Sequence, residues 1–317
     1  MGKKQLLALL FVLWPAFSFA QLTPMNFVYT GSGGQTDALK FTYEGGFFKK
    51  HGIDATMIYV VSGVTTAQAI TAGSAPVATT TGTDALRALA AGAPFKIIMV
   101  NIDRFQHIFV ARQGINGPKD MKGKKIAVSR YGAFSDVQTR FLVRQWGMDP
   151  DKDVQILQIG NSAARAAAMA SGGVDGGIVS PSFIPSAKKA GLNVIFDLST
   201  IPGKFANQIA VADERFIREK PGTVKAVVAG FLDGIKHFRT NAEAGRAYLK
   251  KSYGISESEA ESIYAETRKF IRPDPTPDLD GIQNAWNSIP ELKARGDVDL
   301  SKFIEGRFVA EVLKEAK

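Results

Sequence analysis

The chain has 317 residues, of which 45% are hydrophobic and 22% charged, and it contains no cysteine. This apolar fraction is typical of a globular protein and excludes general disorder, and the lack of cysteine excludes disulfide scaffolds, zinc ribbons and thiol catalysis. The 39 basic and 30 acidic side chains give a formal charge of +9. The basic residues are scattered and form no arginine-rich run, so we expect no nucleic-acid partner.

The first twenty residues are typical of a secretory signal peptide. Lys3 and Lys4 precede an apolar stretch over residues 6–17, and Ser18 and Ala20 are the small residues expected before a cleavage site. The alternative is a membrane anchor, but an apolar helix of this length spans about 18 Å, too little for a hydrocarbon core of about 30 Å. We therefore expect cleavage after Ala20 and an exported, soluble protein.

Predicted strands and helices then alternate along the first third of the chain. Strands are expected at residues 25–30, 56–61, 77–80 and 96–100, and helices at residues 36–50, 65–72 and 84–91. A glycine lies just behind each helix, as is common at helix C-termini. This alternation predicts an α/β architecture with mostly parallel strands.

A second series of the same kind follows. Strands are expected at residues 125–129, 154–159, 177–179 and 194–196, and helices at residues 135–146, 163–171 and 185–190. Shifting the first series by 99 residues places Gly73 on Gly172 and Thr83 on Ser182, with the same order of elements. The sequence therefore predicts two lobes of similar topology rather than a solenoid.

The last third of the chain changes character. One more strand is expected at residues 208–212, and the rest reads as helices at residues 214–220, 221–239, 242–251, 257–271, 279–288 and 303–315. We expect this helical tail to pack on one of the lobes.

Five turns rich in glycine, serine and threonine follow predicted strand ends, at residues 29–34, 61–65, 79–83, 129–135 and 179–183. In open α/β sheets, ligands bind outside the carboxyl ends of the strands. Serine and threonine cap the helices that follow and leave N–H groups pointing outward, an arrangement that suits anions. For any single turn an ordinary helix cap is the alternative, so the prediction depends on the five turns together.

The candidate ligand-binding residues come from these turns and from a polar cluster after another strand. They are Tyr29, Ser32, Gly33, Ser62, Gly63, Thr81, Gly82, Asn101, Arg104, Ser129, Arg130, Tyr131, Ser135, Ser180 and Phe183. Arg130 has the planar fork that suits a carboxylate, sulfonate or phosphate, with a solvated position at the rim as the alternative. Tyr131 and Phe134 are expected to form part of the pocket wall. For Arg104, the alternative to binding the ligand is a local ion pair with Asp103.

No catalytic or metal-binding set emerges from the sequence. His51, His107 and His237 lie far apart and show no metal-ligand spacing. No G-x-S-x-G elbow is present, and the glycines of residues 31–34 lack the third glycine of a dinucleotide-binding turn. We therefore expect no enzymatic activity, no metal and no cofactor.

Several segments resemble one family along the whole exported chain. Residues 43–54, YEGGFFKKHGID, resemble the GFFKKHGLD segment of periplasmic solute-binding proteins of nitrate/sulfonate/taurine (SsuA/THI5-like) ABC transporters. Residues 69–73, 120–126, 129–132 and 166–175 fit the same pattern. One departure is Ala75-Pro76, where many relatives have an aspartate.

The resemblance implies a type II periplasmic binding protein fold with a hinge. Lobe 1 would comprise residues 21–109 and 206–317, with the helical tail packed on it, and lobe 2 residues 110–205. It further implies a monomeric periplasmic receptor that traps a small organic anion or heterocycle and delivers it to an ABC permease. The alternatives on this fold are a ligand sensor and an enzyme of the pyrimidine-synthase type, but the similar enzymes carry cysteines that this chain lacks.

Overall fold

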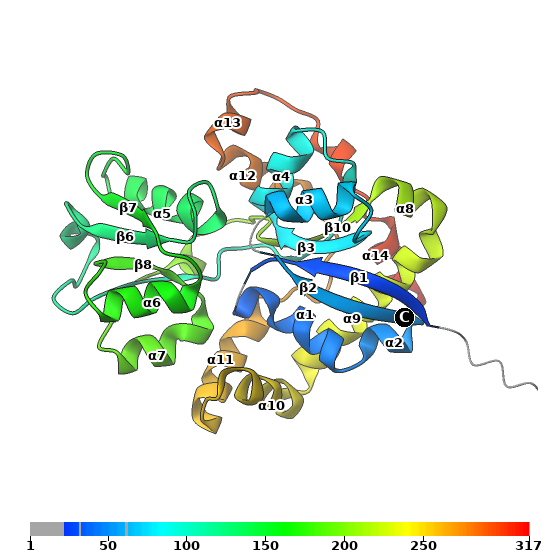
Figure 1. Cartoon of the computed structure of the whole chain (residues 1–317), viewed down its shortest axis with the longest axis horizontal. Coiled ribbons are helices and arrows are strands. Elements are labelled where there is room, and N and C mark those ends of the chain that lie inside the picture. Colours follow the sequence, from blue (N-terminus) through cyan, green and yellow to red (C-terminus); the bar gives the residue numbers. More distant parts are fainter. Residues whose placement is uncertain (1–21, 32, 61–62, 317) are drawn as a thin grey trace, which may run out of the picture.

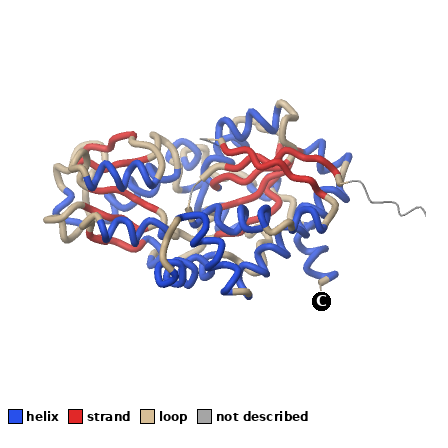
Figure 2. The backbone as a smooth tube through the Cα atoms, turned by 60° about the horizontal axis from the view of Figure 1, so that its bottom comes forward, coloured by secondary structure: helices blue, strands red, loops and turns tan. Residues whose placement is uncertain are grey.

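The computed structural model describes residues 22–31, 33–60 and 63–316, and within them the chain forms two five-stranded sheets. The sheets lie in two separate lobes (Figure 1). Figure 2 shows the two groups of strands at opposite ends of the molecule, each surrounded by helices. The predicted α/β architecture of two lobes is confirmed, and the predicted signal peptide lies outside the described residues.

The first sheet has the strand order β2-β1-β3-β10-β4. Its strands are β1 (Thr23–Tyr29), β2 (Ile53–Tyr59), β3 (Val77–Thr81), β4 (Phe95–Ile102) and β10 (Gln208–Asp213). The helices between them are α1 (Gly34–Glu44), α2 (Phe47–Lys50), α3 (Gly63–Thr71) and α4 (Gly82–Ala90). Strand β1 pairs in parallel with β2 and β3, whereas β10 runs antiparallel between β3 and β4.

The second sheet repeats this arrangement in the order β7-β6-β8-β5-β9. Its strands are β5 (Ile108–Ala111), β6 (Lys125–Val128), β7 (Gln155–Gln158), β8 (Gly176–Val179) and β9 (Asn193–Asp197), and its helices are α5 (Phe134–Gln145), α6 (Ser162–Ala170) and α7 (Ile184–Lys189). Strand β5 is the antiparallel one, between β8 and β9. The two sheets therefore match strand for strand, which confirms the two lobes of similar topology.

Two chain segments cross between the lobes. The first joins β4 to β5, and the second leads from β9 through the short helix η3 (Leu198–Thr200) to β10. The segments run side by side, because Phe205 donates its N–H to the Asp103 carbonyl at 2.6 Å and Asn207 donates to the Ile102 carbonyl at 2.9 Å. This pair of hydrogen-bonded connections joins the two lobes at the place where the hinge is predicted.

The helical tail packs mainly on the first lobe. It consists of α8 (Glu214–Glu219), α9 (Pro221–Thr240), α10 (Ala242–Tyr253), α11 (Glu257–Phe270), α12 (Leu279–Asn287), α13 (Pro290–Lys293), η4 (Leu300–Phe303) and α14 (Arg307–Glu315). Helix α9 lies on α1 and α2, α14 lies on α9 and β4, and α12 lies on α4. Valines and aromatic residues at three- and four-residue spacing give α9 the apolar face that it buries.

Two segments differ from the sequence prediction for local reasons. The helix predicted over residues 36–50 is divided into α1 and α2, because Gly45 and Gly46 interrupt it and Gly46 has a φ of 71°, in the left-handed region that favours glycine. Strand β2 begins at Ile53, earlier than predicted, and Asp54 occupies an exposed position of its alternating burial pattern.

We expect Gly234→Val to destabilise the protein, because Gly234 on α9 lies directly against α1. A Cβ atom there would lie 2.0 Å from the Thr42 Oγ1 atom, and the Thr42 side chain is buried. Overpacking of this kind costs about 1–3 kcal/mol. Urea unfolding measures the loss. Gly222→Ala on the same helix, where an added Cβ meets nothing within 4 Å, is the control and should leave stability nearly unchanged.

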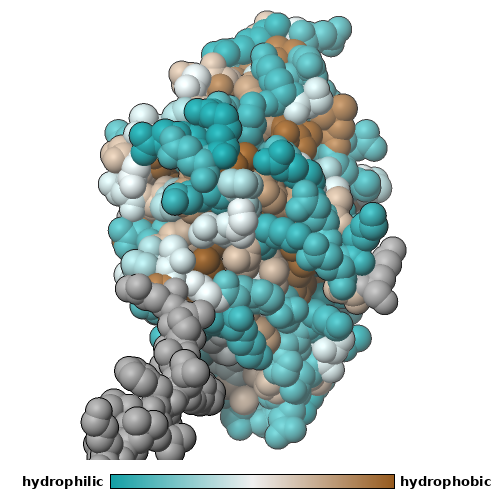
Figure 3. Space-filling view, turned by 90° about the vertical axis from the view of Figure 1, so that its right-hand side faces the viewer, coloured by the Kyte–Doolittle hydropathy of each residue, from teal (hydrophilic) through white to brown (hydrophobic). Residues whose placement is uncertain are grey.

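None of the helices in the described part of the chain combines the length and apolar character needed to span a bilayer. The outer end of the first lobe is covered mostly by hydrophilic residues, with hydrophobic residues in small separate areas (Figure 3).

Candidate functional site

Loops at the carboxyl ends of strands from both sheets enclose one cavity of about 380 Å³ between the lobes. The first lobe contributes the ends of β1, β2 and β3, the second lobe the ends of β6, β7 and β8, and the first crossover contributes one side chain. The lining residues are Thr30, Gly31, Tyr59, Thr81, Asp84, His107, Ser129, Arg130, Ala133, Phe134, Ser135, Gly160, Asn161, Ser162, Arg165 and Ser180. Facing strand ends of two similar sheets are where this architecture binds ligands.

Three helices begin at the cavity wall. Helix α4 starts after Thr81, whose hydroxyl accepts the Asp84 N–H at 3.3 Å, and α6 starts after Asn161, whose Oδ1 accepts the Ala164 N–H at 2.9 Å. Helix α5 starts after Ala133, which also lines the cavity. Helix N-termini carry partial positive charge and favour anions.

Hydroxyl groups of the second lobe form linked pairs in the wall. The Ser135 hydroxyl accepts the Ser129 N–H at 2.8 Å and lies 2.8 Å from the Ser129 hydroxyl. The Ser162 hydroxyl accepts the Ser180 N–H at 3.3 Å. Because these groups tie the end of β6 to α5 and the end of β8 to α6, the polar wall is fixed by the fold itself.

Arg165 is a buried cation at the cavity, with 4% of its surface exposed. Its Nε donates to the Ile178 carbonyl at 2.8 Å, its Nη2 to the Ser162 hydroxyl at 3.1 Å, and its Nη1 to the Gly160 carbonyl. All three acceptors are neutral, and no carboxylate of a described residue pairs with it. Burial lowers the pKa of Arg165 to about 10, so the side chain stays charged at neutral pH.

Arg130 and Asp84 lie in opposite walls of the cavity, Arg130 in the second lobe and Asp84 in the first. The Asp84 carboxylate accepts the Gly63 N–H at 3.3 Å. Burial raises the pKa of Asp84, against the opposing effect of the Arg87 charge and, more weakly, the Arg130 charge.

His107 is the imidazole of the cavity and is 5% exposed. Its Nδ1 lies 3.3 Å from the Gln138 amide nitrogen. Burial, with a further contribution from the Arg165 charge, lowers the pKa of His107 to about 3. The imidazole is therefore neutral at physiological pH and offers a hydrogen bond rather than a charge.

The lobes also touch each other around the cavity. Gly34 donates its N–H to the Ser182 hydroxyl at 3.2 Å, and Arg87 donates to the Gly132 carbonyl. The tail reaches the second lobe as well, because Glu259 on α11 pairs with Lys189 at 2.7 Å. The two lobes and the tail are therefore in direct contact beside the cavity.

The predicted site residues fall into three groups in the structure. Five line the cavity: Thr81, Ser129, Arg130, Ser135 and Ser180. Eight described residues lie outside its lining: Tyr29, Gly33, Gly63, Gly82, Asn101, Arg104, Tyr131 and Phe183. Two, Ser32 and Ser62, lie outside the described residues.

Four of the eight residues outside the lining contact residues of the cavity wall or the chain next to it. The ring of Tyr29 packs against Tyr59, with centroids 5.5 Å apart. Gly63 holds Asp84 through its N–H. Gly82 donates its N–H to the Asn207 carbonyl at 2.9 Å. Gly33 lies so close to the second lobe that a Cβ there would be 2.7 Å from the Ser180 Cβ atom.

The other four make contacts elsewhere. Tyr131 is 53% exposed and donates its hydroxyl to the Ile156 carbonyl at 3.0 Å. The ring of Phe183 faces Tyr253 of the tail, with centroids 6.4 Å apart. Arg104 pairs with Asp103 at 3.3 Å. Asn101 is buried in β4.

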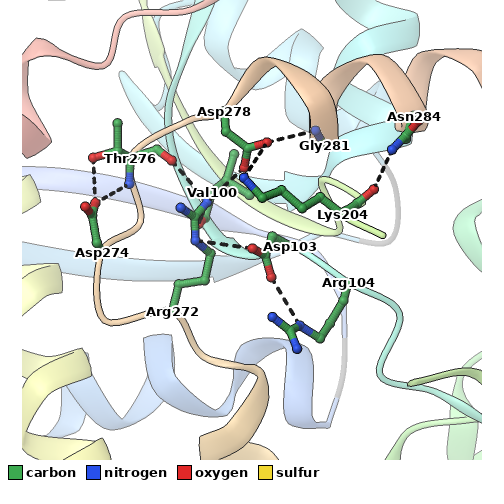
Figure 4. A network of polar contacts seen from close by, with 10 residues as sticks. All are labelled: Val100, Asp103, Arg104, Lys204, Arg272, Asp274, Thr276, Asp278, Gly281 and Asn284. Atoms are coloured by element: carbon green, nitrogen blue, oxygen red, sulfur yellow. Dashed lines mark hydrogen bonds and ion pairs between the residues drawn. The ribbon is translucent and has the colours of Figure 1, made fainter. Parts of the chain in front are cut away.

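A network of charges connects the two crossover segments with the tail (Figure 4). Arg272, from the tail, lies 3.5 Å from the Asp103 carboxylate and 3.3 Å from the Asp278 carboxylate. Lys204 of the second crossover pairs with Asp278 at 3.5 Å. The network therefore ties both crossovers to the tail, and it accounts for the position of Arg104.

We expect Arg272→Met to destabilise the protein by about 1.5–3 kcal/mol, because it removes the tail partner of the Asp103 carboxylate, 8% exposed, and leaves it only Arg104. Thermal and urea unfolding measure the effect. Arg268→Met, at an exposed position of α11, is the matched control. Equal stability of the two variants would contradict a bracing role for Arg272.

Several lining residues are not among those predicted from the sequence, although some of them lie in sequence patterns that could have identified them. Gly160, Asn161 and Ser162 form a sixth small polar turn after a strand, of the same kind as the five that were recognised. Arg165 is the single charged residue of the alanine-rich helix α6. The others missed are Thr30, Gly31, Tyr59, Asp84, His107 and Ala133.

In the part of the chain that the structure describes, no group of three or more histidine, aspartate or glutamate side chains is arranged to hold a metal ion.

Two similar α/β lobes, a double crossover and a polar cavity between facing strand ends define a protein of the periplasmic-binding-protein fold. The chain belongs to the NMT1/THI5-like family, whose model matches residues 41–244. It is 29% identical over 299 residues to a Brucella abortus (strain 2308) protein that is named as a binding protein, a match covering 89% of this chain and 88% of that protein.

Two solved structures show the same fold. The alkanesulfonate-binding protein SsuA from Xanthomonas axonopodis pv. citri, bound to MOPS, has a TM-score of 0.73 at 15% identity, covering 92% of this chain and 98% of SsuA. The desulfurization enzyme DszB has a TM-score of 0.70 at 16% identity, covering 92% of this chain and all of DszB. The fold therefore occurs in both a binding protein and an enzyme.

Proposed function

We propose that this protein is the solute-binding receptor of an ABC importer and that it encloses a small organic anion between its lobes. The observation that carries the proposal is the guanidinium of Arg165, which is buried at the cavity with neutral partners. A buried charge without a counter-charge is costly. An anion in the cavity supplies that counter-charge, and Arg130 and three helix N-termini add to the attraction.

We place the receptor in the periplasm as a monomer, with an ABC permease of the inner membrane as its partner. The support is the signal-peptide pattern of residues 1–20. The chain's family and its similarity to a protein that is named as a binding protein add to it. Fractionation of cells that express the full chain tests the location, and size-exclusion chromatography with light scattering tests the monomer.

A thermal-shift screen tests the binding function. Carboxylates, sulfonates, phosphates and neutral pyrimidines are compared at equal concentration. A ligand present at 100 times its Kd stabilises the folded state by about 2.7 kcal/mol, and we expect such shifts from acids. The ligand should be recovered chemically unchanged. Shifts from neutral heterocycles alone would contradict the anion proposal.

An enzyme on this fold is the second candidate, because DszB shares the fold. We favour a receptor because the chain has no cysteine nucleophile and the His107 imidazole contacts the Gln138 amide rather than a serine hydroxyl. A sensor is separated from a transport receptor by reconstitution. A transport receptor stimulates ATP hydrolysis by the ATPase of its ABC transporter when the ligand is present.

A further inference from the structure

The charged side chains of the cavity are divided between the lobes by sign. Asp84 comes from α4 in the first lobe, whereas Arg130 and Arg165 come from the second lobe. His107, in the crossover, is neutral at physiological pH for the reason given above. A molecule held between the lobes therefore meets a carboxylate on one side and two guanidinium groups on the other.

The Asp84 carboxylate is not neutralised by a direct ion pair, since no basic nitrogen of a described residue lies within 4.0 Å of it. The nearest arginine along α4, Arg87, directs its Nε to the Glu291 carboxylate at 2.7 Å and donates another N–H to the Gly132 carbonyl. The protein itself gives Asp84 the Gly63 N–H at 3.3 Å and a hydrogen bond from the Thr81 hydroxyl. A carboxylate at the cavity surface accepts further donors.

We propose that the ligand is amphoteric, with an acidic group facing Arg165 and Arg130 and a protonated amine, or an equally strong N–H donor, facing Asp84. This inference rests on the proposed receptor function and narrows it to a class of ligand. A simple anion binds beside Asp84 without repulsion only when that carboxyl, whose pKa burial raises, takes up a proton, whereas an amine pairs with the carboxylate. A simple cation lies against two arginines. Like charges at such close range disfavour binding.

The walls between the charged ends fit a short apolar linker. Tyr59 of the first lobe and Phe134 of the second lobe line the same cavity. The cavity volume of about 380 Å³ lies near the lower end of the usual range for small-molecule pockets. A ligand with one group bound to each lobe also gains its full set of contacts only when the lobes are closed, which couples binding to closure.

Matched pairs of acids test the proposal by isothermal titration calorimetry. The pairs are butyrate with γ-aminobutyrate, propanesulfonate with its ω-amino derivative, and benzoate with its aminomethyl derivative. Within the best-binding pair, the amine-bearing acid should bind the wild-type protein at least about tenfold more tightly than the plain acid.

The Asp84→Asn variant keeps the side-chain shape and an oxygen for the Gly63 N–H, but removes the charge. It should reduce the preference within each pair to about one and should leave the plain acid bound as well as before or better. Asp280→Asn, at an exposed position of α12, is the control and should keep the wild-type preference. Thermal melts confirm that both variants are folded.

Three outcomes overturn the proposal. If plain acids bind as tightly as their amino derivatives, Asp84 selects nothing, although the receptor function for an anion still holds. If Asp84→Asn weakens both members of a pair equally, Asp84 acts on lobe closure through Arg130 and not on the ligand. If no acid of the set binds, both this proposal and the proposed anion receptor are wrong.

Discussion

Arg165→Gln is expected to weaken the binding of an acidic ligand by about 10- to 150-fold. A hydrogen bond to a charged group contributes about 1.5–3 kcal/mol, and each 1.4 kcal/mol is a factor of ten in Kd. The effect should be specific to charge, because the buried guanidinium is held by neutral acceptors and its charge remains available to the cavity. Titration calorimetry with the best acid of the thermal-shift screen gives the Kd values.

Stability is read separately from binding in this experiment. The glutamine amide nitrogen takes the place of the arginine Nε and retains a donor toward the Ile178 carbonyl. The bonds to Gly160 and Ser162 are lost together with the buried charge, so opposing effects on stability are expected. We expect the unliganded variant to unfold within about 2 kcal/mol of wild type. Arg144→Gln, on the exposed side of α5, is the control. An Arg165→Gln protein that binds the acid as tightly as wild type would remove the main support for the anion proposal.

The topology was predictable because it depends on local signals. Alternating apolar runs and glycines behind the helices mark each strand and helix, and the shift of 99 residues marks the repetition. The antiparallel places of β5 and β10 were not visible locally, because they arise from the chain crossing twice between the lobes. Gly45 and Gly46 also mark the end of α1 in the sequence, although a single helix is predicted across them.

The candidate site was only partly predictable, because a turn can be recognised without knowing which way its side chains point. Arg130 and Tyr131 are neighbours in one turn, yet Arg130 lines the cavity and Tyr131 donates its hydroxyl to Ile156 on the outside. Arg104 followed a strand end as expected, but its partner Asp103 also binds Arg272, which is 169 positions further along the sequence and outside the reach of local patterns. Arg165 is not among the predicted site residues because it lies within α6, whereas the candidates were taken from turns after strand ends.

Acidification is expected to destabilise the wild-type protein relative to His107→Gln. Burial lowers the pKa of His107 from about 6.5 to about 3, so below pH 6.5 the unfolded chain binds a proton that the folded protein does not. The stability that the neutral imidazole contributes is fully present above pH 6.5 and is lost as the pH falls toward 3. At about 1.36 kcal/mol per pH unit, the loss between pH 6.5 and pH 4.5 is about 2–3 kcal/mol.

Urea unfolding of both proteins at pH 7.5 and pH 4.5 measures this difference. Asp37, whose pKa burial raises to about 6, changes stability in the opposite direction over the same range, but it is present in both proteins and cancels. His51→Gln, beside Asp233 at the surface, is the control. If the stability difference between wild type and His107→Gln were the same at both pH values, His107 would not be held neutral. A bound anion near His107 and Arg165 favours the imidazolium, so a saturating acidic ligand should reduce the acid sensitivity of the wild-type protein.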